Sequence, residues 1–375
     1  MLPKRVALLT TEIPPYRHAL FNALRVRIHD FRVFVSSPRE VHHPPPGWSV
    51  DVTFQHTLLL DHVWRHPTGF QEPAPVAVPY DTLWVLQRFR PDVVISGEMG
   101  LRTIQALAYR RLRPASRLVM WATASEENEK GRGHWREILR RWLVPRVDAV
   151  IVNGRNGAGY VRRCGARKER VVSIPQTTHV QQFADVRLDR SAVEAKRLLY
   201  VGQLIERKGL LPFLDTLSRW ASMHPREHVE FWLAGAGELR PRIEAQVVPP
   251  NLEVRCLGQI QYADLPATYA QAGIFAFPTL ADEWALVVNE ALAGGLPVLG
   301  SLYSQAVDEL TTDGVTGWHF RPDHPAEMLE GLNRALTTSE DELHRMRVAG
   351  RQRALQLTPE YVADRMVDVV RHVSG

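Results

Sequence analysis

The chain has 375 residues, of which 45% are hydrophobic and 23% are charged, so it can form two globular domains and does not have a disordered composition. No run approaches the roughly 20 apolar residues that a membrane-spanning helix needs, and the short apolar start disfavours a secretory signal. Cys164 and Cys256 are too few for a disulfide framework or a cysteine-based zinc site. We therefore expect a cytoplasmic protein. The formal net charge of +5 indicates acidic partners only weakly, although arginines are dense between positions 102 and 170.

Short apolar, β-branched runs alternate with longer amphipathic stretches along the first half of the chain. This alternation predicts a parallel sheet covered by helices, which is the α/β class. The region 41–79, rich in proline and histidine, is expected to be an irregular loop. The predicted strands are Val6–Leu9, Phe31–Ser36, Val93–Ser96, Leu118–Trp121, Ala149–Asn153 and Val171–Ile174.

A second series of strands follows a polar stretch without a clear period. The sequence therefore predicts two doubly wound, Rossmann-like domains, residues 1–178 and 197–355, joined by a linker over 179–196. The C-terminal helix over 356–375 is expected to pack back on the first domain. The predicted strands are Leu198–Val201, Val229–Ala234, Leu252–Leu257, Ile274–Pro278, Pro297–Gly300 and Gly317–Phe320.

The most specific segment of the sequence is 278–298. Its pattern predicts a strand, a short loop with two acids, a helix over about 284–293 that ends at Gly294 or Gly295, and a further strand. Ligands of open parallel sheets bind beyond the carboxyl ends of the strands, where this loop and the start of this helix would lie. Unpaired amides at a helix start suit a phosphate. The amides expected to point at the ligand are those of Ala285, Leu286 and Val287.

Asp282 and Glu290 lie eight residues apart in this segment. They can face one ligand if Asp282 lies in the loop rather than in the helix. The alternative is that Asp282 only caps the helix and that Glu290 is a solvated acid.

The segment 198–209 places Gly202, Gln203, Arg207 and Lys208 after an apolar strand. A glycine-containing turn with a cation between a strand and a helix suits a pyrophosphate, for which lysine supplies a point charge. A lysine after a strand is also common in a solvated turn, and that alternative stays open.

Together these segments resemble the retaining GT-B glycosyltransferases of family 4, also called group 1 glycosyl transferases. Residues 282–298 resemble the family's E-x7-E region, and 201–209 resemble its V-G-R-L-x-x-x-K-G sequence. The resemblance implies that Glu290 binds the nucleotide ribose, that Asp282 contacts the transferred sugar and that Lys208 holds the donor diphosphate. The chain departs from the family at three positions, with Gln203 for arginine, Asp282 for glutamate and Ala285 for glycine.

The resemblance implies a GT-B fold whose two domains face a central cleft, with a nucleotide-sugar donor in the second domain and a carbohydrate or lipid-linked acceptor in the first. It also implies a metal-independent transferase without a cofactor, working in bacterial polysaccharide or glycolipid synthesis. Asp282 and Lys208 are the candidate catalytic residues. The candidate donor-binding residues are Gly202, Gln203, Arg207, Lys208, Gly235, Gly237, Ile260, Trp284, Ala285, Leu286, Val287 and Glu290.

Polar residues just past the predicted strand ends of the first domain are the acceptor-side candidates. A helix over 134–143 is amphipathic and carries several arginines. It could lie on an anionic membrane at the inner face of the cytoplasmic membrane, or its apolar side could be core with solvated arginines. The acceptor candidates are Tyr16, Arg17, Glu98, Arg102, Ser125 and Glu126.

Two other functions remain open. The departures at Gln203, Asp282 and Ala285 favour a catalytically silent GT-B scaffold in a polysaccharide assembly complex, which would bind nucleotide weakly without turnover. Another GT-B enzyme, such as an epimerase or a phosphorylase, would need different residues in the cleft. Histidines without metal-ligand spacing argue against a metal site. Arginines without interleaved exposed aromatics disfavour nucleic acid.

Overall fold

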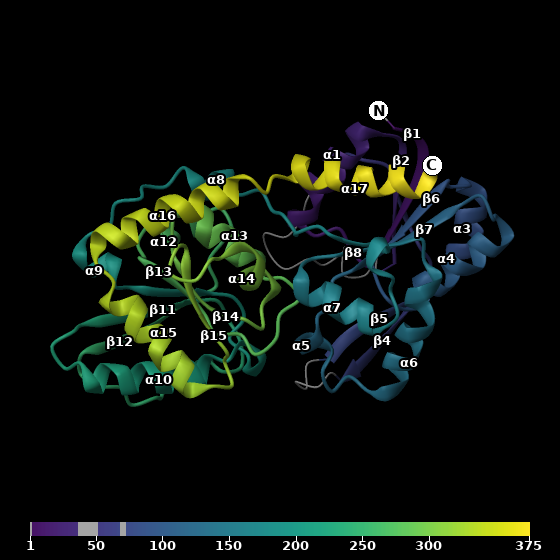
Figure 1. Cartoon of the computed structure of the whole chain (residues 1–375). Coiled ribbons are helices and arrows are strands. Elements are labelled where there is room, and N and C mark those ends of the chain that lie inside the picture. The colour runs from purple at the N-terminus through teal and green to yellow at the C-terminus, as the bar shows by residue number, and fades with distance from the viewer. Residues whose placement is uncertain (1, 37–51, 68–72) are drawn as a thin grey trace. The chain divides into compact units, whose positions relative to one another are not determined.

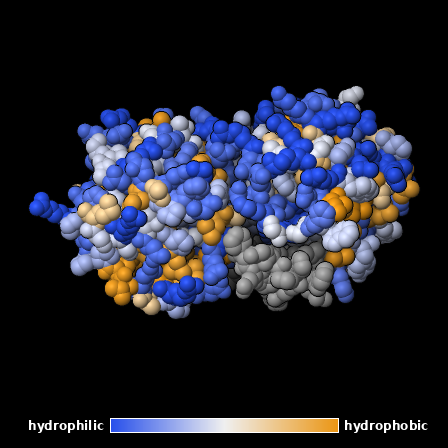
Figure 2. Space-filling model, turned by 60° about the horizontal axis from the view of Figure 1, so that its bottom comes forward, coloured by the Kyte–Doolittle hydropathy of each residue, from blue (hydrophilic) through white to orange (hydrophobic). Residues whose placement is uncertain are grey.

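The computed structural model describes residues 2–36, 52–67 and 73–375, which form two compact units (Figure 1). Unit 1 consists of Met1–Thr178 and Thr358–Gly375, and unit 2 of His179–Leu357. Each unit has a parallel sheet with helices, so the predicted α/β class is confirmed. The strands predicted from the sequence are all present, and their ends differ from the prediction by at most four residues. The face drawn in Figure 2 is mostly hydrophilic, with hydrophobic residues in separate groups.

The sheet of unit 1 has the strand order β3-β2-β1-β6-β7-β8-β9, and its neighbouring strands are parallel. The chain moves outward in one direction from β1 and then in the other from β6. The strand order therefore reverses between these two strands, which is where open sheets bind ligands. The strands are β1 (Leu2–Thr10), β2 (Ile28–Val35), β3 (His56–Leu58), β6 (Val93–Ser96), β7 (Arg117–Ala122), β8 (Ala149–Val152) and β9 (Val171–Ser173).

Helices cover both faces of this sheet, and each face has its own apolar core. On one face α17 lies beside α1 (Figure 1), joined by an ion pair from Arg27 Nε to Asp364 Oδ1 at 2.6 Å. The last helix of the chain is thus part of unit 1. The elements are α1 (Pro15–Arg27), α3 (Thr82–Phe89), α4 (Leu101–Leu112), α5 (Glu126–Glu129), α6 (His134–Leu143), η1 (Val144–Arg146), α7 (Arg155–Arg163), η2 (Lys168–Arg170) and α17 (Pro359–Ser374).

The expectation of an irregular loop over 41–79 is wrong for the part that the structure describes. This part contains β3, which extends the sheet, and an antiparallel pair formed by β4 (Asp61–Pro67) and β5 (Pro73–Pro79). Residues 41–51 and 68–72 lie outside the described residues. Prolines obscured the pattern, because proline disfavours central strands but is tolerated in an isolated two-stranded ribbon, where both strands are edges.

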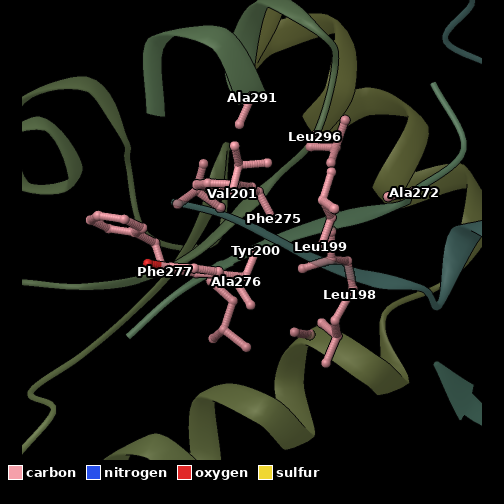
Figure 3. Close-up of a cluster of buried hydrophobic side chains, with 14 of the residues drawn as sticks. Leu198, Leu199, Tyr200, Val201, Ala272, Phe275, Ala276, Phe277, Ala291 and Leu296 are labelled. Atoms are coloured by element: carbon pink, nitrogen blue, oxygen red, sulfur yellow. The ribbon is translucent and has the colours of Figure 1, made fainter. Parts of the chain in front are cut away.

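The sheet of unit 2 has the order β12-β11-β10-β13-β14-β15 and is parallel, so its strand order reverses between β10 and β13. Apolar residues of these two strands, such as Leu199 and Phe275, meet Ala291 and Leu296 in the core (Figure 3). The strands are β10 (Leu198–Val201), β11 (Val229–Ala234), β12 (Leu252–Gly258), β13 (Ile274–Phe277), β14 (Val298–Ser301) and β15 (Gly317–Phe320). The remaining elements of unit 2 are α8 (Gln181–Ala184), α9 (Ala192–Ala195), η3 (Glu206–Lys208), α10 (Leu210–Met223), α11 (Arg240–Glu244), α12 (Leu265–Tyr269), α13 (Leu286–Ala293), α14 (Gln305–Leu310), α15 (Pro325–Thr337) and α16 (Glu340–Leu355).

The segment 179–196, expected as a linker, contains α8 and α9 and packs on unit 2. Arg190 is 7% exposed and donates from Nε to the Ala272 carbonyl at 2.7 Å and from Nη2 to the Gly294 carbonyl at 3.2 Å. Burial and neighbouring arginines lower the pKa of Arg190 to about 10. One of the polar residues that suggested a linker is therefore buried and binds backbone carbonyls of unit 2.

Glycines let the loops that follow the central strands of unit 2 touch backbone to backbone. A Cβ on Gly235, whose φ is +149°, would lie 1.8 Å from the Gly202 carbonyl oxygen. A Cβ on Gly209 would lie 2.3 Å from the Pro278 carbonyl oxygen. The loops after β10, β11 and β13 can therefore keep their spacing only with glycine at these positions.

We predict that Gly235→Ala lowers the free energy of unfolding of unit 2 by more than about 3 kcal/mol, because neither backbone can move without breaking the sheet. Gly258→Ala is the control. Gly258 also has a positive φ of +74°, but its Cβ would meet only a flexible arginine end at 3.7 Å. The control should cost about 1 kcal/mol. Denaturant titration of both variants measures the difference, and equal losses would contradict the contact argument.

Candidate functional site

The candidate site lies at the carboxyl ends of β10 and β13, where the strand order of unit 2 reverses. Two loops meet there, 202–209 after β10 and 278–285 after β13, and we call them the first and second site loops. The Leu280 amide donates to the Arg207 carbonyl at 2.9 Å, and the Thr279 hydroxyl donates to the same oxygen at 3.2 Å. In the other direction Arg207 Nη1 donates to the Ala281 carbonyl at 3.1 Å. Two segments about seventy residues apart are thus held as one surface.

Lys208 and Asp282 form an ion pair across the two site loops. Lys208 Nζ contacts Asp282 Oδ2, and Arg207 Nη1 lies 3.7 Å from the same oxygen. The Lys208 and Asp282 side chains are 12% and 13% exposed. Burial alone would raise the pKa of Asp282, but the two cations and a hydrogen bond from the Trp284 amide lower it below its usual value. The structure brings the two predicted catalytic residues together, with Asp282 ionised.

The helix expected over about 284–293 begins two residues later, at Leu286, because Trp284 belongs to the fixed loop before it. Trp284 is 2% exposed and donates from Nε1 to Asn289 at 2.9 Å, so its side chain packs in the core. Ala285 precedes the helix with φ +74° and ψ +80°, a left-handed conformation that favours glycine. The carbonyl of Trp284 accepts from Ser304 Oγ and from the Ala306 amide, both at 3.0 Å.

The first turn of α13 has backbone amides that no intrahelical carbonyl can reach. The Val288 amide bonds back to the Ala285 carbonyl at 3.0 Å, whereas Leu286 and Val287 are the half-buried residues before it. The first turn contains no acidic residue. Together with Lys208, this helix start can hold an anion.

Glu290 is buried in the middle of α13, 5% exposed, and is not the solvated acid of the alternative interpretation. Tyr269 donates from its hydroxyl to Glu290 Oε2 at 3.3 Å. Burial raises the pKa of Glu290 to about 8, although hydrogen bonds from Tyr269 and Tyr262 oppose the rise. Glu290 and Asp282 therefore have separate partners, and near neutral pH Glu290 is largely protonated whereas Asp282 is ionised.

The remaining donor-side candidates lie on the neighbouring loops. Gly202 and Gly235 pack against each other, and a Cβ on Gly237 would lie 2.3 Å from the Leu204 carbonyl, so loop packing alone requires these glycines. Gln203 is exposed, and its carbonyl accepts from the buried Tyr200 hydroxyl at 2.8 Å. Ile260 is half-buried against the core of unit 2.

In unit 1, Glu98 and Arg102 come together at the ends of β1, β2 and β6. Arg102 is 4% exposed and donates from Nη2 to Glu98 Oε2 and to the Thr11 hydroxyl, both at 2.8 Å, and from Nη1 to Ser36. The Glu98 side chain is 26% exposed. Arg102 thus joins three strand ends and orients Glu98, which is the more accessible of the two.

The other acceptor-side candidates divide into two groups. Arg17 lies over the Trp121 ring at 4.9 Å and over the Tyr16 ring at 5.9 Å, next to the end of β1. Ser125 is 1% exposed and caps α5, and Glu126 pairs with Arg163 at 2.7 Å. Helix capping and a surface ion pair are therefore the roles that the structure gives to Ser125 and Glu126.

One interpretation of the sequence is that the apolar side of helix α6 packs in the core and its arginines are solvated. The structure differs from that interpretation. Leu143 is buried, but Trp135, Ile138 and Trp142 are exposed by 83%, 42% and 43%. The inner face instead contains Arg140, which is 3% exposed. Within the ranges that the structure describes, no helix is both long and apolar enough to span a bilayer.

One group of possible metal ligands is present among the described residues, formed by His228, Glu230 and Glu253 within 4.8 Å. It lies at the amino ends of β11 and β12, the opposite edge of the sheet from the site loops. Glu230 already accepts from Arg197 Nε and from Trp232 Nε1, both at 2.9 Å. These two hydrogen bonds already satisfy the buried carboxylate of Glu230 without a metal ion.

Sequence reasoning missed the tyrosines that surround Glu290 and the residues that fix the second site loop. Tyr262 and Tyr269 lie 28 and 21 residues before Glu290, and Ser304 and Gln305 follow the next strand. Gln305 Nε2 donates to the Glu283 carbonyl at 2.7 Å. A pattern within one short segment of sequence cannot show these contacts. Polar residues that directly follow predicted parallel strands do indicate which side chains gather at the carboxyl edge of the sheet.

We predict an unusual pH dependence from Glu290. A carboxyl with a pKa of about 8 in the folded chain and 4.5 as its ordinary value binds more protons when folded, so its contribution to stability is lost as pH rises from about 4.5 to 8. Glu290→Gln keeps the shape and cannot ionise. The variant should match the wild type at about pH 4, below both pKa values, and its free energy of unfolding should exceed that of the wild type by about 1 kcal/mol or more at pH 9. Glu238→Gln, at an exposed position of the same unit, is the control, and parallel pH profiles for Glu290→Gln would contradict the assignment.

A second prediction concerns the strained residue before α13. A left-handed alanine costs about 1–2 kcal/mol, and glycine at this position removes that cost. Glycine also loses more conformational entropy on folding, which takes back about 0.5–1 kcal/mol of the gain. Ala285→Gly should therefore raise the free energy of unfolding by about 0.5 kcal/mol or more. Ala270→Gly, at a residue with φ −63°, should lower it. Denaturant titration of both variants measures the two changes in the free energy of unfolding. A decrease in both variants would mean that Ala285 is not strained.

Comparison with known proteins finds a family similarity within unit 2. Residues 195–338 match the family model described as "Glycosyl transferases group 1". The chain is 26% identical over 184 residues to the Campylobacter jejuni GalNAc-alpha-(1->4)-GalNAc-alpha-(1->3)-diNAcBac-PP-undecaprenol alpha-1,4-N-acetyl-D-galactosaminyltransferase, covering 49% of this chain and 48% of that protein. It is 34% identical over 84 residues to a sucrose synthase of Thermosynechococcus vestitus, covering 22% of this chain and 10% of that protein. The matches thus span about half or less of each relative.

Similar folds extend over the whole chain. Anabaena HepE in complex with UDP superposes with a TM-score of 0.70 at 14% identity and covers 98% of this chain and all of that one. The sucrose-phosphate synthase of Thermosynechococcus elongatus superposes with a TM-score of 0.68 at 17% identity, with 99% of each chain covered. The chain therefore has the GT-B fold, and its residues 195–338 are similar to the group 1 glycosyl transferases.

Proposed function

We propose that the chain is a glycosyltransferase that binds a nucleotide diphosphate sugar in unit 2 and transfers the sugar to an acceptor hydroxyl. The observation that supports this most directly is the grouping of Lys208, Asp282 and the start of α13 where the strand order of the sheet reverses. The cation and the amides at that place suit the negative charge of a diphosphate, and the carboxylate can accept from a hydroxyl of the attached sugar.

The proposed roles follow from the contacts of each group. Lys208 and the α13 amides bind the diphosphate, and Arg207 supplies the second cation in place of the arginine absent at Gln203. When the diphosphate binds, its negative charge competes with Asp282 for Lys208 Nζ. Asp282 then has a carboxylate oxygen available for a sugar hydroxyl while its other oxygen still accepts from the Trp284 amide, at 3.2 Å.

Glu290 suits the ribose hydroxyls because it is buried and hydrogen-bonded on one side by Tyr269. A carboxyl held partly protonated near neutral pH can both donate to and accept from a hydroxyl. The half-buried Ile260 and the loops at Gly235 and Gly237 are the proposed neighbours of the base. This arrangement would fix the leaving nucleotide at both ends.

The chemical step requires stabilisation of the charge that develops on the leaving phosphate, which preorganised cations and amides provide. We propose transfer with retention of configuration and without a metal ion, with Lys208 and the α13 amides acting on the phosphate. In unit 1, Glu98, Tyr16 and Arg17 are the proposed acceptor contacts, positioned by Arg102. The name of the Campylobacter relative specifies a PP-undecaprenol acceptor, which favours a lipid-linked acceptor at the cytoplasmic face of a membrane for this chain also.

A catalytically silent scaffold is the second candidate, and the substitutions at Gln203, Asp282 and Ala285 favour it. Turnover distinguishes the two. UDP-, GDP-, ADP- and TDP-sugars are screened by thermal shift without metal, and release of the nucleotide diphosphate is then measured with the strongest binder. A selective shift with slow release that chelator does not abolish is the expected result. Binding without release in the presence of lipid-linked and soluble acceptors would support the scaffold.

We predict that Lys208→Ala weakens binding of the selected nucleotide diphosphate at least about tenfold, since one buried charge-assisted contact is worth about 1.5–3 kcal/mol. Glu290→Gln should weaken it less, because the amide can still bond to a ribose hydroxyl. The control is Lys196→Ala, which removes a half-buried lysine of the same unit paired with Glu227. Isothermal titration gives the affinities and circular dichroism checks folding. Unchanged affinity in a folded Lys208→Ala protein would remove this lysine from the site.

A further inference from the structure

Helix α6 of unit 1 has a row of large apolar side chains on its solvent face. Trp135, Ile138 and Trp142 follow the i, i+3, i+7 spacing that places residues on one side of a helix. Their exposed fractions of 83%, 42% and 43% show that no described part of the chain covers them. Isolated exposed apolar residues are ordinary, but two tryptophans and an isoleucine in one row form a patch that water solvates poorly.

The opposite face of α6 is fixed to unit 1, so the exposed row has a defined orientation. Leu143 is buried in the core, and Arg140 contacts the 7% exposed Glu129 and donates to the Tyr160 hydroxyl at 2.6 Å. A buried arginine with two partners is costly to displace. The helix cannot therefore turn its tryptophans inward without losing this buried ion pair.

Arginines border the exposed row. Arg136 and Arg141 are 43% and 61% exposed and pair with Glu129 and Glu137, and solvent screens the exposed Arg141–Glu137 pair. The guanidinium of Arg146 lies over the Trp142 ring at 4.7 Å. Such arginines can exchange their partners for lipid phosphates while tryptophan rings occupy the region of the headgroups.

The charge of the two units is strongly asymmetric. Unit 1 carries 29 lysines and arginines against 18 aspartates and glutamates, whereas unit 2 carries 17 against 23. An anionic lipid surface would attract unit 1 and repel unit 2, so electrostatics selects the unit that bears α6. A protein partner would need matching acidic residues, and a second copy would bring together two positively charged units.

We propose that α6 is a membrane-docking helix that lies on an anionic lipid surface and inserts Trp135, Ile138 and Trp142 among the headgroups. This inference gives the proposed lipid-linked acceptor a surface of approach, but its test requires neither donor nor turnover. A failure of the membrane test would therefore leave the donor site unaffected. Equally, a silent unit 2 would not prevent docking.

The test is flotation of the full chain with vesicles of phosphatidylglycerol and phosphatidylcholine at low and at physiological salt. The double variant Trp135→Ala/Trp142→Ala should reduce partitioning at least about tenfold. Trp84→Ala is the matched control, because Trp84 is a 61% exposed tryptophan of the same unit on α3, and it should float like the wild type. Vesicles of phosphatidylcholine alone should bind weakly.

Three results would overturn the proposal. The first is no flotation with anionic vesicles, and the second is equal flotation of the double variant. The third is dimerisation of the wild type in sedimentation velocity that the double variant abolishes, which would assign the exposed row to a second copy of the chain. Circular dichroism of both tryptophan variants establishes that a loss of binding does not come from unfolding.

Discussion

The contact between the two site loops is the constraint on which the candidate site depends. Backbone meets backbone there, because Gly209 lies against the Pro278 carbonyl and the Leu280 amide bonds to Arg207. This packing sets Lys208 opposite Asp282, and the ion pair in turn lowers the pKa of Asp282. A site made by two segments so far apart in sequence has a defined geometry only if the parallel strands β10 and β13 are neighbours. The site thus needs three things in turn. The strands β10 and β13 must be neighbours, glycine must stand where the two loops touch, and the charges of Lys208 and Asp282 must then face each other.

The two acids of the site illustrate how environment, and not residue type, sets charge. Asp282 has two cations and an amide as neighbours, so it is ionised although buried. Glu290 has only tyrosine hydroxyls, and burial raises its pKa to about 8. A sugar diphosphate brings its own negative charge, and a site with two ionised carboxylates would repel it. Keeping one acid neutral and the other paired with Lys208 leaves the region around the helix start positive.

The fold was predictable because the information is local. Short β-branched runs mark each strand, and strands separated by amphipathic helices must be parallel, which brings their carboxyl ends, and with them Lys208 and Asp282, to one edge. What the sequence could not show depends on distant partners. The Tyr269 contact with Glu290 and the burial of Arg140 require knowledge of neighbouring elements. The periodicity of α6 shows that the helix has two different faces, but not which of them the core covers. Prolines likewise hid the β4 and β5 ribbon.

The three departures from the family pattern can be judged from the structure in physical terms. Ala285 keeps the left-handed backbone that glycine would adopt freely, so the start of α13 has the same course at a cost in strain. Asp282 is shorter than glutamate, yet it reaches both Lys208 and the Trp284 amide. At Gln203 a cation is absent, but Arg207 directs its guanidinium toward the same carboxylate. Ala285 thus retains a backbone course and Asp282 a charge, whereas at Gln203 the charge is lost and the neighbouring Arg207 supplies a cation. Glycine at 285 would give the same backbone course without strain, so the alanine costs stability whichever function unit 2 has, and turnover of the donor rather than these positions distinguishes an enzyme from a scaffold.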